Sequence, residues 1–125
     1  MVFKRGVQLV CFLLLAVGTC RAADKIIFTP APGVSAPPKE SPCKIEIISE
    51  KSPARKYLEL GTINFHAEWH RSGSGVKPEQ ALQKLQERAC QVGADAIMNV
   101  QTTQGKRLEF AFINVRVTAI RFESQ

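Results

Sequence analysis

The sequence has 125 residues, a formal net charge of +6 and four cysteines. This length leaves room for one domain, and so small a domain often needs a cross-link or a partner to stabilise its core. The basic residues are scattered, and aromatic residues do not alternate with them as on a nucleic-acid-binding platform. We therefore expect no nucleic-acid partner.

The first residues have the features of an export signal. Lys4 and Arg5 supply a positive n-region, and the apolar run Val7–Val17 follows with a single polar interruption. The run is shorter than a membrane-spanning helix but has the length of a signal-peptide core. We therefore expect an exported protein with residues 1–22 as its signal sequence.

Two modes of cleavage fit the end of this leader. The four residues ending at Cys20 read Val-Gly-Thr-Cys, which is similar to a bacterial lipobox with Thr19 in place of the usual glycine, alanine or serine. Cleavage there would leave a lipid on Cys20 and hold the protein at the outer membrane, facing the periplasm. Ordinary cleavage after Ala22 would instead release it into the periplasm.

Residues 23–42 are interpreted as a proline-rich tether and residues 43–125 as a single folded domain. The stretch 29–42 contains five prolines and no periodic apolar pattern. Such a stretch favours the extended polyproline II conformation and behaves as a semi-rigid spacer. The preceding segment, residues 24–28, is expected to be too short to fold independently.

Two strands are expected in the first half of the domain. Residues 43–48 form the first, with Ile45 and Ile47 on one face. Residues 57–69 form a longer strand whose apolar register changes partway. Because this change occurs at Gly61, it indicates a β-bulge.

A helix is predicted between Pro78 and Gly93. Pro78 fits the first turn, Glu79 suits the positive N-terminal end, and Gly93 is a natural C-terminal stop. Apolar residues recur at the three-four spacing that makes one stripe. The stripe consists of Leu82, Leu85, Ala89 and Val92.

Two further strands follow the helix. Residues 95–101 form one, residues 103–106 read as a hairpin turn, and residues 108–122 form the last. The last strand is apolar on both faces near its ends, so we expect it to lie centrally in the sheet. The order β-β-α-β-β predicts an α+β fold, with a small antiparallel or mixed four-stranded sheet and one packed helix.

The candidate metal ligands are His66, Glu68 and His70. On a helix, two histidines four residues apart could share a zinc ion. The alternation of apolar residues around them indicates a strand instead, on which residues four apart lie about 13 Å apart. That separation is too large for one metal unless the chain folds back. The favoured interpretation is a polar, solvated face of the sheet.

The sequence contains no arrangement typical of an active site. No nucleophile and base pair stands out, and no phosphate-binding glycine loop or paired-acid motif occurs. Only two histidines are present, and both fall in one expected strand. We expect no catalytic residues and no cofactor, and hence a non-enzymatic protein.

Cys43 and Cys90 are the two cysteines of the expected domain. In an oxidising periplasm they could pair. Closing a loop of that length would stabilise the fold by about 4 kcal/mol if the effect is chain entropy. The alternative is that Cys90 is a small buried residue beside the helix stripe.

Three segments together resemble the RcsF-like lipoproteins and the related YbjQ-type small domains. They are residues 53–63, which end a strand in Leu-Gly, residues 81–89 within the helix, and residues 93–100, which read Gly-Ala-Asp-Ala before a strand. The resemblance covers roughly residues 43–122, and the leader and tether continue it. It also favours lipidation at Cys20.

The resemblance implies an outer-membrane-anchored lipoprotein that monitors the cell envelope and contacts other envelope proteins. Its domain would be a small sheet with a packed helix, braced by disulfides. On this basis we expect an envelope protein that acts by protein contacts, with envelope-stress sensing or signalling as its role. The alternative is a soluble periplasmic domain that binds a small ligand or a metal.

Overall fold

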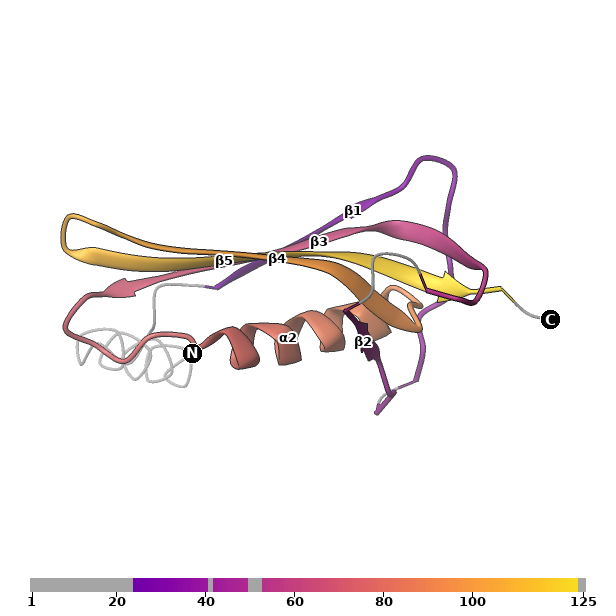
Figure 1. Cartoon of the computed structure of the whole chain (residues 1–125), viewed down its shortest axis with the longest axis horizontal. Helices are drawn as coiled ribbons and strands as arrows, with labels where there is room; N and C mark the ends of the chain where they lie inside the picture. Colours follow the sequence, from indigo (N-terminus) through magenta and orange to yellow (C-terminus); the bar gives the residue numbers. More distant parts are fainter. Residues whose placement is uncertain (1–23, 41, 50–52, 124–125) are drawn as a thin grey trace, which may run out of the picture.

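The computed structural model describes residues 24–40, 42–49 and 53–123. Five strands form one mixed sheet, and a helix packs along one of its faces (Figure 1). The strands are β1 (Lys25–Pro30), β2 (Glu46–Ile48), β3 (Tyr57–His70), β4 (Ala96–Arg107) and β5 (Phe110–Phe122). The helix is α2 (Pro78–Gln91). The expected signal sequence and the candidate lipid anchor Cys20 lie outside the described residues.

The sheet has the order β1-β3-β5-β4-β2. β3 and β4 flank β5 and run antiparallel to it, β1 runs antiparallel to β3, and β2 runs parallel to β4. The α+β class and the central position of the last strand are therefore confirmed. No helix among the described residues has both the length and the apolar character needed to span a membrane.

The sheet has five strands, not the four that were predicted, because the start of the expected tether is part of the fold. β1 pairs with β3 so that Ile26 lies opposite Phe65 and Phe28 opposite Ile63. Six residues are too few to fold alone, but the free edge of β3 supplies their hydrogen bonds, and the side chains of Ile26 and Phe28 pack against the core. Of the expected tether, residues 23–42, this segment is thus a strand rather than a spacer.

The proline-rich stretch that follows β1 has no helix or strand, as expected, but it packs on the domain. Ala31 N–H donates to the Leu60 carbonyl oxygen at 2.8 Å. Val34 and Ala36 contact the hydrophobic core, and Lys39 N–H donates to the Cys90 carbonyl oxygen at 3.0 Å. The stretch therefore crosses from one edge of the sheet to the other as a strap over the end of α2.

The bulge predicted at Gly61 is present in β3, where the register with β5 shifts between Glu59 and Gly61. Gly61 has a φ of 151°. A side chain there would collide with the carbonyl oxygen of Thr29 in β1. Glycine is therefore required for β1 to lie against the bulge.

The hairpin turn predicted at residues 103–106 is wrong. β4 continues to Arg107, and the turn consists of Leu108 and Glu109. Gly105 lies within the strand, where its missing side chain leaves room for the ring of Phe112. Gly105 therefore marks a close approach of two strands and not a turn.

The helix is confirmed, and its apolar stripe lies on the inner face of the sheet. Leu85 and Ala89 are fully buried, whereas Leu82 and Val92 are half-buried. Gly93 has a φ of 85° and ends the helix. The inner face of the sheet supplies the opposing side chains, which are Ile63, Phe65, Ile97, Ile113, Val115 and Val117.

A second, smaller cluster covers one end of the opposite face. Ala96, Met98 and Ile120 are its buried members, and Tyr57 and Phe122 pack against it. The expected pairing of Ile45 and Ile47 on one strand face is wrong, because the strand begins only at Glu46. Ile45 precedes the strand and is buried in the main core, whereas the side chain of Ile47 is 42% exposed.

Candidate binding surface on the open sheet face

The sheet face opposite α2 is uncovered beyond the second cluster. Side chains alternate along a strand, so the residues between the inward-facing ones lie together on this face. Two rows run across the strands from β1 to β4, and a third runs from β3 to β4. We call the open face the following set: Lys25, Ile27, Asn64, His66, Glu68, Gln101, Thr103, Phe112, Asn114 and Arg116.

The open face carries positive charge beside an apolar side chain. Ile27 is 58% exposed and lies in one row with Asn64 and Arg116. Lys25 and Arg116 are both exposed. The ion pairs within the described ranges include neither of them. The surface therefore offers two cations to an acidic partner.

A second feature is the tip of the β4–β5 hairpin, which extends past the open face. We call the hairpin tip the set Arg71, Lys106, Arg107, Leu108, Glu109 and Phe110. Leu108 is 85% exposed and Phe110 is 50% exposed. The Arg71 guanidinium donates to the Leu108 carbonyl oxygen at 3.2 Å, and Arg71 N–H donates to the Glu109 carbonyl oxygen at 2.8 Å.

A cleft of about 290 Å³ lies where the open face meets the hairpin tip. His66, Glu68 and Phe112 line it from one side, and Arg107, Leu108 and Phe110 from the other. The His66 ring stacks on the Phe112 ring, with centroids 6.1 Å apart. The cleft thus combines two phenyl rings and an imidazole with one arginine and one carboxylate.

The candidate metal ligands are on this side of the molecule but do not converge. His66 Nε2 lies 3.1 Å from Glu68 Oε1. His70 instead places Nδ1 2.6 Å from Ser72 Oγ, and its Nε2 lies 4.0 Å from Glu109 Oε2. Among the described residues, no three His, Cys, Asp or Glu side chains are grouped to hold a metal ion. The structure brings together His66 and Glu68 but leaves His70 in a separate pair.

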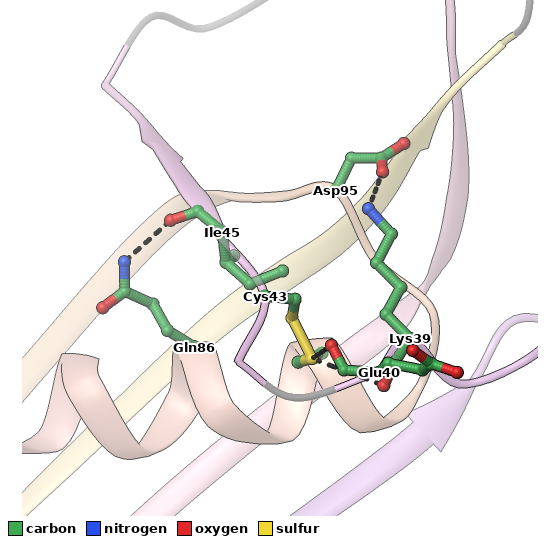
Figure 2. Close-up of a disulfide and its surroundings, with 7 residues drawn as sticks. Lys39, Glu40, Cys43, Ile45, Gln86 and Asp95 are labelled. Carbon is green, nitrogen blue, oxygen red and sulfur yellow. Dashed lines mark hydrogen bonds and ion pairs between the residues drawn. A yellow bond between two sulfur atoms is a disulfide. The ribbon is translucent and has the colours of Figure 1, made fainter.

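Cys43 and Cys90 form a disulfide-capable pair, with Cα atoms 6.2 Å apart and the two sulfurs joined in the structure (Figure 2). The pair fixes the end of the strap to the last turn of α2. Gln86 reinforces this attachment by donating from Nε2 to the Ile45 carbonyl oxygen at 2.8 Å. An open hollow of about 710 Å³ lies beside the pair.

Asp95 is a junction that the sequence did not reveal. Its carboxylate pairs with Lys39 of the strap (Figure 2). It also accepts a hydrogen bond from Phe122 N–H at 2.8 Å. Burial raises the pKa of Asp95, but the bonds from Lys39 and Phe122 and the charges of Lys39 and Arg121 outweigh it, so the net pKa is lowered. The ionised carboxylate therefore ties strap and sheet together.

Compared with known proteins, the chain matches no protein-family model, no curated protein and no solved structure.

Proposed function

We propose that this chain is an exported, non-enzymatic envelope protein that acts by protein contacts through its open face. The observation that carries the proposal is the exposed side chain of Ile27 beside Lys25 and Arg116, two cations for which the described residues supply no ion pair. Protein interfaces commonly combine an apolar anchor with arginine. The partner is an envelope protein with an acidic surface, because carboxylates complement these two charges.

The leader and the resemblance to RcsF-like lipoproteins support anchoring by a lipid on Cys20, at the outer membrane and facing the periplasm. In this role the partner contact would report on envelope stress. The intact mass of the protein from fractionated cells tests the anchor. A membrane-bound species that begins at Cys20 and carries acyl chains supports it, whereas a soluble species that begins near Ala23 contradicts it.

The contact surface is tested by photo-crosslinking in cells. Thr103 lies on the open face, whereas its neighbour Thr102 points to the other side of the same strand, so the two positions are a matched pair. A crosslinkable residue at Thr103 is expected to capture one discrete envelope protein, and the same residue at Thr102 is not. Capture at both positions alike, or at neither, contradicts the proposed surface.

A charge reversal separates a specific contact from chance capture. Arg116→Glu is expected to abolish the crosslink from Thr103, and Lys44→Glu, an exposed basic residue beside the disulfide, is expected to retain it. Reversal of an acidic residue in the captured protein should restore the crosslink to Arg116→Glu. Equal capture by both variants would show that charge complementarity does not direct the contact.

The cleft favours a second candidate function, the binding of a small ligand in the periplasm. Its stacked His66 and Phe112 rings and its Arg107 suit a small anionic molecule with an apolar part. If the cleft binds such a ligand, the ligand raises the melting temperature of the protein, and His66→Ala abolishes this rise. Zinc and copper are tested in the same way, and unchanged melting with every ligand would remove the candidate.

A further inference from the structure

We propose that the hairpin tip docks on the surface of the lipid bilayer, so that the domain stands on the membrane beside its own anchor. The proposal rests on the lipid at Cys20 from the proposed function, but it concerns a different surface and a different partner. Two observations carry it: the composition of the hairpin tip and the position of the first strand.

The hairpin tip has the composition of an interfacial membrane contact. The side chain of Leu108 is 85% exposed and that of Phe110 is 50% exposed, which makes them two of the most exposed large apolar side chains among the described residues. Arg71, Lys106 and Arg107 surround them, against the single carboxylate of Glu109. Apolar side chains that enter the acyl boundary, ringed by cations that meet anionic headgroups, are typical of peripheral membrane contacts.

The strand β1 brings the lipid anchor to the same end of the molecule. β1 begins at Lys25, which pairs with His66, and His66 in turn pairs with Asn114 of β5. Lys84 Nζ lies 3.0 Å from Asp24 Oδ2 and ties this start to α2. Figure 1 shows that β1 and α2 both start toward the end of the molecule that carries the β4–β5 turn.

The lengths match. Asn114 of β5 lies level with the start of β1, and the β4–β5 turn adjoins Phe110, four residues away along β5. The turn therefore lies about 13 Å beyond the start of β1. The five residues from Cys20 to Lys25 span at most about 17 Å when fully extended. A lipid on Cys20 therefore holds the hairpin tip within reach of the bilayer. A free tether of twenty residues would let the hairpin tip lie far from the bilayer. Residues 23–42 are not such a tether, because they include β1 and the strap.

Docking of the hairpin tip directs the strands away from the membrane and leaves the open face free for a protein partner. The charge of the tip selects anionic headgroups, and the phosphatidylglycerol of a bacterial membrane supplies them. The occupant is therefore an anionic phospholipid surface, and a protein that covers the same tip is an outcome that the test can reveal.

Vesicle binding of the mature chain from residue 20 onward with Cys20→Ala, which carries neither the leader nor the acyl group, tests the proposal. We expect binding to vesicles that contain phosphatidylglycerol, with affinity that falls at high salt, and at least tenfold weaker binding to phosphatidylcholine vesicles. Leu108→Ser is expected to weaken binding by about tenfold. Leu58→Ser is the matched control, because Leu58 is 44% exposed at the opposite end of the sheet.

Insertion itself is read from fluorescence. Leu108→Trp is expected to shift its emission to the blue on phosphatidylglycerol vesicles and to be quenched by brominated acyl chains, whereas Leu58→Trp is not. Equal binding by Leu108→Ser and the parent chain, no preference for anionic lipid, or no blue shift overturns the proposal. A protein captured from a crosslinkable residue at Leu108 in place of lipid would also overturn it. Partner capture at Thr103 needs no vesicle, so the proposed function can stand or fail separately.

Discussion

Gly105 lies directly opposite Phe112 in the β4–β5 ladder, and the Phe112 ring occupies the space that a side chain on Gly105 would fill. A Cβ at this position would lie 2.7 Å from two ring carbons. The ring covers the bare backbone of β4 and forms one wall of the cleft with His66. An aromatic residue that covers a strand glycine in this way stabilises the pair.

Gly105→Ala is therefore expected to displace the Phe112 ring and lower the free energy of unfolding by about 1–2 kcal/mol. The loss should disappear in a Phe112→Leu background, where no ring meets the new methyl group. Urea unfolding of the two single variants and the double variant measures this coupling as a double-mutant cycle. If the losses in free energy of unfolding of the two single variants simply add in the double variant, the position of the Phe112 ring does not depend on Gly105.

The helix, the strand around His66 and the misplaced turn show how much of this fold the sequence could predict. The helix was predictable because its signals, Pro78, the apolar stripe and Gly93, are all local. The alternation around His66 likewise predicted a polar sheet face. Gly105 was misread as part of a turn, because a strand glycine differs from a turn glycine only through its partner across the ladder.

Other features depend on residues far apart in the sequence. Lys25–Pro30 becomes a strand because β3 has a free edge, and nothing within those six residues shows that edge. The Lys39–Asp95 pair joins residues 56 positions apart. The cleft was missed for a related reason, since Arg107 joins Phe110 in one row only when the turn is placed at Leu108. The apolar second face of the last strand was the one signal that pointed to it.

Gly61→Ala is expected to detach β1 from the sheet. The φ of 151° disfavours any side chain, and the new methyl group would collide with the backbone of Thr29, which cannot move while β1 stays paired. We expect a loss of about 2–4 kcal/mol and faster hydrogen exchange at the amides of Ile26 and Phe28.

Gly73→Ala is the control for Gly61→Ala. Gly73 does not have a positive φ, and the nearest atom to an added Cβ lies 3.4 Å away. Its melting temperature should stay within a degree or so of the parent's, since exposed loop changes have little effect. Unchanged exchange at Ile26 in Gly61→Ala would show that β1 does not depend on this glycine.

The ion pair of Lys39 with Asp95 is expected to make stability depend on pH. Because the folded-state pKa of Asp95 is lowered, its contribution is present above the unfolded pKa of about 3.9 and is lost as the pH falls through the folded pKa. Asp95→Asn should lower the free energy of unfolding by about 1–2 kcal/mol at pH 7. The difference from the parent should shrink below about pH 4.

Urea unfolding at pH 7 and near pH 3 measures this dependence. Lys39→Gln removes the other partner of the ion pair. Its difference from the parent in free energy of unfolding should likewise shrink at low pH. Lys44→Gln, which removes an exposed charge beside the disulfide, should not. A difference between Asp95→Asn and the parent that stays constant with pH would contradict an ionic contribution.

Reduction of the Cys43–Cys90 pair is expected to cost about 4 kcal/mol, since the closed loop restricts the unfolded chain over a sequence separation of 47. The loss should appear first in the strap, which the pair fixes to α2. Urea unfolding with and without reductant measures the change, and hydrogen exchange at the Lys39 amide locates it. The double variant Cys43→Ala, Cys90→Ala should unfold like the reduced parent and ignore reductant. If oxidised and reduced parent protein unfold at the same urea concentration, Cys90 acts only as a buried apolar residue and the strap is held by Lys39 and Asp95 instead.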